Sequence, residues 1–122
     1  MLDTSAYSAL MHGDQAVMNV VSMAAEILVP AVVLGELHSG FKRGTRTREN
    51  VAQLDRFLSK PTVRVVSLTS DTAIRYAEID VYLLGKGKPI PRNDVWIAAS
   101  AMEHGSQLLT LDAHFRQIPL LP

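Results

Sequence analysis

The sequence has no cysteine, no long apolar run and no excess of either charge. Without cysteine the chain cannot form disulfides, use a thiolate nucleophile or build a cysteine-based zinc site, which suits a reducing compartment. No stretch approaches the roughly eighteen apolar residues of a membrane-spanning helix, and no secretory signal is visible. We therefore expect a cytoplasmic protein without membrane association. The four histidines lack HExxH spacing, which argues against a zinc protease.

Charge and length bound the kind of protein that the chain can be. Twelve basic and twelve acidic residues cancel, so attraction for a polyanion such as RNA must come from local clusters of charge. Hydrophobic residues make up 48% of the chain and charged residues 20%, a composition typical of globular proteins. A chain of 122 residues supports one core, so we expect a single domain over residues 1–122.

Short apolar segments alternate with helical patterns. We expect strands at residues 1–2, 27–29, 63–68 and 108–111. Ser70 is the expected cap of a helix that ends at the 85–87 turn. The inward stripe predicted for this helix is Ala73 or Ile74, Ala77, Val81 and Leu84.

Two further helical patterns differ in the burial that they predict. The segment from Asn93 to Met102 is apolar nearly all round, so we expect a buried helix that stops at Gly105. Residues 45–58 show one apolar stripe of Val51, Leu54 and Leu58, so that helix should lie on the surface. Short strands separated by helices indicate a parallel sheet, because parallel neighbours need a long crossover. The expected fold class is α/β, a three-layer α/β/α arrangement with a central parallel sheet.

Carboxylates follow the predicted strands, at the edge where parallel sheets hold their ligands. Asp3 and Asp112 come directly after strands, Glu36 lies about two helical turns beyond Val29, and Asp94 opens the buried helix. The four could therefore converge. Three of the four acids also have a purely structural interpretation. Asp94 and Asp112 could cap or open helices, and Asp3 could be a solvated charge. Glu36 interrupts an apolar stretch, where burying an ionised side chain requires a partner or a cation.

Convergence of the acids would have an electrostatic consequence. Two carboxylates about 4 Å apart repel by about 4 kcal/mol at an effective dielectric constant near 20, so a cluster needs a proton or a cation. All-oxygen ligands suit Mg²⁺ or Mn²⁺, which bind through a few carboxylates together with substrate phosphate. The pattern therefore points to phosphodiester chemistry.

Four segments also resemble the acidic motifs of the PIN domain family, in the family's order and over nearly the whole chain. They are Leu2-Asp3-Thr4-Ser5, Val33-Leu34-Gly35-Glu36-Leu37 with Gly40, the segment from Pro91 to Ala101, and Leu109-Thr110-Leu111-Asp112-Ala113-His114-Phe115. Within the family, the length and the Asn93-Asp94-x-x-Ile97-Ala98-Ala99 form of the third motif are most similar to the compact VapC-like toxins. One departure is that only Met1 and Leu2 precede Asp3, so the first strand is expected to be short.

The resemblance implies a Mg²⁺- or Mn²⁺-dependent endoribonuclease that acts as the toxin of a VapBC-type toxin–antitoxin pair. It implies that the catalytic and metal-binding residues are Asp3, Glu36, Asp94 and Asp112. It further implies an RNA substrate, a homodimer and a cognate antitoxin protein. Ser5, Asn93 and Thr110 could support the carboxylates or the substrate, or could simply be capping and turn residues.

A basic segment follows the second motif. Residues 42–48 hold four cations, Lys42, Arg43, Arg46 and Arg48, which could contact RNA phosphates or form a solvated helix end.

Two other functions compete with the nuclease. A phosphoacceptor receiver domain would need paired acids after the first strand and a lysine after the last, and neither is present. A catalytically inactive PIN-like scaffold or RNA-binding module remains the alternative, although all four acids are present.

Overall fold

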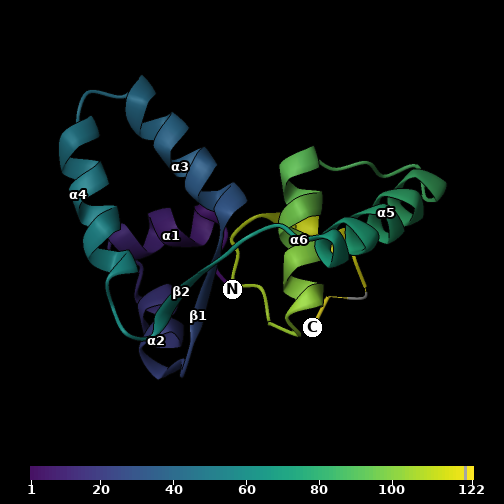
Figure 1. Cartoon of the computed structure of the whole chain (residues 1–122), viewed down its shortest axis with the longest axis horizontal. Coiled ribbons are helices and arrows are strands. Elements are labelled where there is room, and N and C mark those ends of the chain that lie inside the picture. Colours follow the sequence, from purple (N-terminus) through teal and green to yellow (C-terminus); the bar gives the residue numbers. More distant parts are fainter. Residues whose placement is uncertain (120) are drawn as a thin grey trace.

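The computed structural model describes residues 1–119 and 121–122, and it shows helices on both sides of a small parallel sheet (Figure 1). The α/β fold predicted from the sequence is confirmed. In chain order the elements are α1 (Thr4–Met11), α2 (Gln15–Met23), β1 (Ile27–Pro30), α3 (Ala31–Arg43), α4 (Thr47–Leu58), β2 (Val63–Val66), α5 (Ser70–Gly85), α6 (Arg92–Glu103) and a short 3-10 helix, η1 (Ala113–Gln117).

The sheet is built around β1. It pairs in parallel with β2, with Ile27 opposite Val63. On its other side the Leu2 amide donates to the Leu28 carbonyl at 3.0 Å, and Leu2 in turn forms a parallel bridge with Leu109. Two single-residue contacts thus extend the two-stranded sheet toward the C-terminal segment, so the carboxyl ends of four chain segments meet at one edge.

Three of the predicted strands are shorter than expected, and the one at residues 1–2 is reduced to the bridge at Leu2. β2 ends at Val66 instead of residue 68, because its partner β1 ends at Pro30 and α3 begins at the next residue. The segment predicted as a strand over 108–111 keeps only the bridge at Leu109. Beyond it, the Leu111 amide donates to the Ser5 hydroxyl at 3.0 Å, so a side chain replaces the neighbouring strand.

The core occupies both faces of β1, as an α/β/α arrangement requires. Ile27 and Val29 belong to a large cluster that includes residues of α1, α3 and α4. Leu28 points the other way, into a smaller cluster with Met1, Val66 and Ala101 of α6. The alternation follows from the strand geometry, in which successive side chains lie on opposite faces.

The buried face of α5 differs from the prediction. Ile74, Val81 and Leu84 are 58%, 69% and 58% exposed, so the expected inward stripe faces outward. The buried residues are Thr72, Ile79 and Leu83, which also have helical spacing. The helix has apolar side chains on two faces, and packing against α6 selects one of them.

The N-terminal end of α5 also differs from the prediction, whereas its C-terminal end agrees. Its N-cap is Thr69, one residue before the predicted Ser70, and the Thr69 hydroxyl accepts a hydrogen bond from the Thr72 amide. The predicted stop is confirmed, because the helix ends at Gly85 and Gly87 adopts a φ of 65°, a conformation that favours glycine.

The remaining helices agree more closely with the sequence. Residues Val95 and 97–101 of α6 are buried, as its apolar composition predicts. α4 begins at Thr47, two residues later than expected. Of its predicted stripe Leu54 is buried and Val51 and Leu58 are half-buried, and Phe57, which was not predicted, is buried as well. Two helices without a predicted counterpart, α1 and α2, connect Asp3 to β1. Within residues 1–119 and 121–122, no helix is long and apolar enough to cross a membrane.

Candidate functional site

Asp3 is the most enclosed of the four acids, at 4% exposure. It caps α1: one carboxylate oxygen accepts from the Ala6 amide at 2.9 Å and from the Ser5 hydroxyl at 2.7 Å. The other accepts from the Thr110 hydroxyl. The Asp3 amide also donates to the Leu109 carbonyl at 3.3 Å. The short first strand therefore holds its aspartate firmly between α1 and the C-terminal segment.

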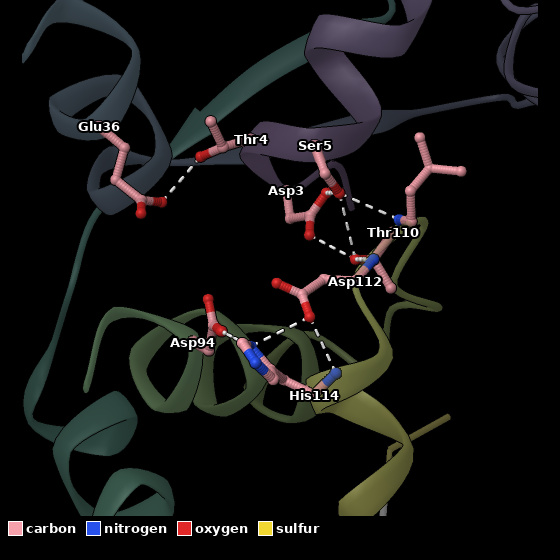
Figure 2. Close-up of polar contacts among 9 residues, drawn as sticks. Asp3, Thr4, Ser5, Glu36, Asp94, Thr110, Asp112 and His114 are labelled. Carbon is pink, nitrogen blue, oxygen red and sulfur yellow. Dashed lines mark hydrogen bonds and ion pairs between the residues drawn. The ribbon is translucent and has the colours of Figure 1, made fainter. Parts of the chain in front are cut away.

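Thr110 joins two of the acids. Its hydroxyl donates to Asp3 and accepts a 2.9 Å hydrogen bond from the Asp112 amide. Asp112 in turn caps η1, because its Oδ1 accepts from the His114 amide at 2.9 Å. The capping interpretation of Asp112 thus holds together with its place beside the other acids (Figure 2). The interpretation of Asp3 as a solvated charge is wrong, because Asp3 is buried and caps α1.

Asp94 lies in the first turn of α6 and faces Asp112 across an imidazole. The Nδ1 atom of His114 lies 2.9 Å from Asp94 Oδ2 and 3.0 Å from Asp112 Oδ1. Burial raises the pKa of the Asp94 carboxyl above its ordinary value. The hydrogen bond from His114 opposes that rise, and the negative charges of Asp112 and Glu36 add to it. Asp94 therefore carries a charge that its surroundings do not fully compensate.

Glu36 reaches the same space from α3. Its Oε1 accepts a 2.7 Å hydrogen bond from the hydroxyl of Thr4, the residue after Asp3. Figure 2 shows Glu36 facing the space around which Asp3, Asp94 and Asp112 are gathered. A cavity of about 490 Å³ beside Glu36 is lined also by Asn93 and by Arg43, the last residue of α3. Glu36 lies on α3 and does not directly follow a strand, but it reaches the same edge of the sheet as the other three acids.

The arrangement fits a divalent cation by the chemistry of its donors. Asp94, Asp112 and His114 each place a ligand atom within 4.8 Å of the others. Oxygen donors suit hard ions, and a cation would offset the burial and, to a smaller extent, the repulsion from Asp112 and Glu36 that raise the pKa of Asp94. Asp3 adds a buried carboxylate that hydrogen bonds tie to Thr110, next to Asp112 in the chain. Asp94 and Asp112 lie at ligand distance from each other, whereas Asp3 and Glu36 border the same space outside that group.

Two residues of this site, Thr4 and His114, belong to the first and fourth motifs but have no function predicted from the sequence. The position of His114, two residues after Asp112, is the only local signal that places it beside that acid. Of the residues left open, Ser5 and Thr110 do hydrogen-bond to Asp3, whereas Asn93 lines the cavity beside Glu36.

Comparison with known protein families matches residues 1–121 to the PIN domain. This chain belongs to the PIN domain family. Its PIN domain is 30% identical over 126 residues to Ribonuclease VapC2 of Rickettsia felis, covering 99% of this chain and 92% of that protein. It is 26% identical over 115 residues to Ribonuclease VapC5 of Mycobacterium tuberculosis, covering 94% of this chain and 84% of the relative.

Solved structures show the same PIN fold. The crystal structure of VapBC2 from Rickettsia felis, bound to a DNA fragment from their promoter, has a TM-score of 0.88 at 28% identity. The alignment covers 99% of this chain and 93% of that one. VapBC-1 from nontypeable Haemophilus influenzae also has a TM-score of 0.88, at 23% identity, with 99% and 92% covered.

Proposed function

We propose that this chain, as a single domain, is a metal-dependent endoribonuclease that acts as the toxin of a VapBC-type pair. The observation that carries the proposal is that Asp94, Asp112 and His114 lie at ligand distance from one another, with Asp3 and Glu36 bordering the same space at the carboxyl edge of the parallel sheet. Ribonuclease VapC2 of Rickettsia felis, similar over almost the full length of this chain, supports the choice of RNA as substrate. The four acids are proposed as the catalytic and metal-binding residues, with Mg²⁺ or Mn²⁺ as the ion.

The four acids have different surroundings, which suggest different roles. Asp94 and Asp112, whose side chains are 14% and 34% exposed, would hold the cation, with Asp3 as a further ligand held by Thr110. When bound, the ion lowers the pKa of a water molecule and neutralises charge on the scissile phosphate. Glu36, fixed by Thr4 on the opposite side of the space, would orient that water or complete the ligand set.

The cavity beside Glu36 is the proposed entry of the RNA backbone. Arg43 lines it together with Glu36 and Asn93, so a cation lies at the edge of an otherwise acidic site. Phosphates that flank the scissile bond need neutralisation, and an exposed arginine supplies it without reading the base sequence. This gives Arg43, within the basic segment at residues 42–48, a function in positioning substrate, whereas Arg46 is paired with Glu49.

The proposed protein partners are based on the same similar proteins. The solved neighbours are VapBC assemblies, so we propose a cognate antitoxin that binds this chain and blocks the acidic site. We also propose that the chain forms a homodimer. Because transfer and ribosomal RNA are found in the cytoplasm, we place the protein there.

The first test is RNA cleavage by the purified chain without any partner. Wild type, Asp94→Asn and Asp55→Asn are assayed on a pool of transfer and ribosomal RNA with Mg²⁺, with Mn²⁺ and with EDTA. Asp55 is an exposed aspartate on α4 and serves as the matched control. We expect cleavage by wild type and Asp55→Asn that EDTA stops. We expect a loss of at least about 100-fold in Asp94→Asn, with an unchanged circular dichroism spectrum.

Two outcomes would count against the proposal. A folded wild type that cleaves none of these RNAs would favour the catalytically inactive PIN-like module. Cleavage that survives both EDTA and Asp94→Asn would place the chemistry elsewhere on the molecule.

A further inference from the structure

A second cavity lies between the end of α1 and α4. Its volume is about 650 Å³, and its basic lining residues are Arg46, Arg48, Arg56 and His12. The residues that line it differ from those that line the cavity beside Glu36. Figure 1 shows α4 on the outer side of α3, across the molecule from α6. This second cavity, the arginine pocket, is therefore separate from the acidic site.

The arginine pocket carries an excess of positive charge. Its acidic lining residue, Glu49, forms an exposed ion pair with Arg46. Within residues 1–119 and 121–122, neither Arg48 nor Arg56 forms an ion pair. Because acidic and basic residues balance over the whole chain, the excess is local to this part of the surface. The pocket therefore attracts an anion.

The positions of these arginines do not favour α4 itself. Arg46 is the N-cap of the helix and Arg48 lies in its first turn. The helix dipole is positive at that end, so cations there lower the stability of the helix slightly. Arg48, Ala52 and Arg56 are four residues apart and exposed, so they form one stripe about 12 Å long. A stripe of this length suits an anion whose charges repeat along a chain.

The lining of the arginine pocket favours a nucleic acid backbone over a protein segment. Guanidinium groups bind phosphate oxygens through two parallel hydrogen bonds. Asn50 and Gln53 add side-chain amides, which can contact phosphate and sugar oxygens. The apolar part of the lining comes from Met11 and Ala52, whereas a docked protein segment needs pockets for large apolar anchors. An RNA backbone has no such need.

The basic segment at residues 42–48 connects the arginine pocket with the acidic site. Arg43 lines the cavity at the acidic site, whereas Arg46 and Arg48 line the arginine pocket. Helix α1 provides a second connection, because Asp3 caps its first turn and its other end borders the pocket. The eight residues of α1 span about 12 Å. An RNA that extends a few nucleotides beyond the scissile bond can therefore occupy both places.

We propose that the arginine pocket is an RNA-binding exosite, which holds phosphates of the substrate away from the scissile bond. The inference rests on the RNA substrate of the proposed function and adds a second contact with it. This contact raises the affinity for RNA and takes no part in the chemical step. Because phosphates carry no sequence information, the pocket selects for the length and shape of the RNA.

The first experiment measures RNA binding without cleavage. The parent is Asp94→Asn in EDTA, and fluorescently labelled transfer RNA is titrated by anisotropy at several salt concentrations. Arg48→Ala/Arg56→Ala removes two arginines of the pocket. Lys86→Ala/Lys88→Ala is the matched control, because it removes two exposed cations beyond the end of α5.

We expect the arginine double variant to bind the transfer RNA about 10-fold more weakly than the parent. The slope of log Kd against log salt should decrease by about two, because two phosphate contacts are lost. The lysine double variant should match the parent in both quantities. Circular dichroism spectra of all three proteins show whether they are equally folded.

The second experiment locates the bound RNA, and the absence of cysteine from the sequence makes the labelling specific. Ala52→Cys places a thiol in the arginine pocket, and Ala77→Cys places one on the exposed surface of α5. Each thiol is coupled to a benzophenone in the Asp94→Asn parent and irradiated with the same transfer RNA. We expect a cross-linked product from position 52 that unlabelled RNA competes away, and none from position 77.

Unchanged RNA affinity in Arg48→Ala/Arg56→Ala, or equal cross-linking at positions 52 and 77, would overturn the inference. Labelled poly-L-glutamate tests the other kind of occupant. If the double variant loses affinity for poly-L-glutamate and keeps its affinity for RNA, the pocket binds an acidic protein segment and the inference is wrong.

The outcomes for the exosite and for the ribonuclease can be told apart, because neither experiment involves cleavage. An active wild type whose arginine double variant binds RNA normally would reject the exosite alone. An inactive wild type that binds RNA through the arginine pocket would reject the ribonuclease alone.

Discussion

The Nδ1 atom of His114 lies 2.9 Å from Oδ2 of Asp94, although twenty positions separate the two residues in the sequence. The same nitrogen lies 3.0 Å from Asp112. One imidazole thus stands between two carboxylates that would otherwise oppose each other. The hydrogen bond to Asp94 raises the pKa of His114, with the negative charge of Asp112 adding to the rise, so each group favours the charged form of the other.

The first prediction concerns this imidazole. His114→Ala removes the donor between Asp94 and Asp112 and leaves their repulsion uncompensated, so the variant should melt at a lower temperature than wild type in EDTA. Added Mg²⁺ or Mn²⁺ should raise the melting temperature of the variant more than that of wild type, because the ion takes over the compensation. Thermal melts with and without metal measure this effect.

The control for that comparison is His12→Ala. His12 is exposed at the end of α1, and its Nδ1 contacts the Ser8 carbonyl at 2.7 Å, so it has no contact with the acids. An equal metal-induced rise in both alanine variants would contradict the prediction.

The second prediction concerns the hydroxyl that joins Asp3 to the C-terminal segment. Thr110→Val keeps the shape of the side chain but leaves one oxygen of the buried Asp3 without its donor. We expect a loss of about 1–3 kcal/mol in the free energy of unfolding and of about 10- to 100-fold in cleavage. Urea denaturation and RNA cleavage measure the two effects. Thr45→Val, at an exposed loop position, should change neither, and similar losses in both variants would show a general effect of valine.

The third prediction concerns substrate binding. Arg43→Ala should raise KM for RNA with little change in kcat, because Arg43 lines the cavity beside Glu36 and touches none of the acids proposed to hold the ion. The slope of log KM against log salt should decrease by about one unit, because one phosphate contact is lost. Lys60→Ala is the control, since Lys60 precedes β2 at the opposite edge of the sheet. A loss of kcat with unchanged KM would assign Arg43 to the chemical step.

The fourth prediction concerns stability in acid. Glu103, at the end of α6, accepts hydrogen bonds from the Thr72 hydroxyl and from Thr69 Oγ1, the latter at 2.9 Å. The bond from Thr72 is the main reason that the pKa of Glu103 lies below its ordinary value, and the bond from Thr69 adds to it. A lowered folded pKa gives stability that is present above the unfolded pKa and is lost as the pH falls through the folded pKa.

Glu103→Gln should therefore unfold more easily than wild type at neutral pH, by no more than about 1 kcal/mol because solvent screens the partly exposed carboxylate. The difference should vanish below the folded pKa. Urea titrations at several pH values measure it. Glu78→Gln, which breaks an exposed ion pair, is the control. A difference between Glu103→Gln and wild type that persists unchanged into acid would reject the linkage.

The sequence located the acids but not the network that holds them. Asp3 and Asp112 were predictable because each follows an apolar strand segment, and the end of a parallel strand is a fixed place in an α/β fold. His114 and Thr4 were missed because their partners lie far away in the chain. A hydrogen bond between residues 20 or 32 positions apart leaves no local pattern in a single sequence.

The buried face of α5 was likewise not predictable from the sequence. The apolar period of 3.6 residues correctly predicted a helix ending at Gly85, but two faces of that helix satisfy the period. The structure buries Ile79 and Leu83, and ring stacking at 4.2 Å between Tyr76 and Trp96 of α6 adds to that choice. Which stripe is buried depends on the neighbouring helix, which local periodicity cannot specify.

The sequence by itself determined the α/β class and the order of the apolar segments, and it supplied the four carboxylates proposed for the site, because these follow from local periodicity and from the kinds of residue that end a strand. Only the tertiary structure decided that Asp94 and Asp112 meet across His114, that Thr110 holds Asp3, and that α5 turns Ile74, Val81 and Leu84 to solvent. Those results depend on contacts between distant segments, whose energies are set when the helices pack against the sheet and against one another.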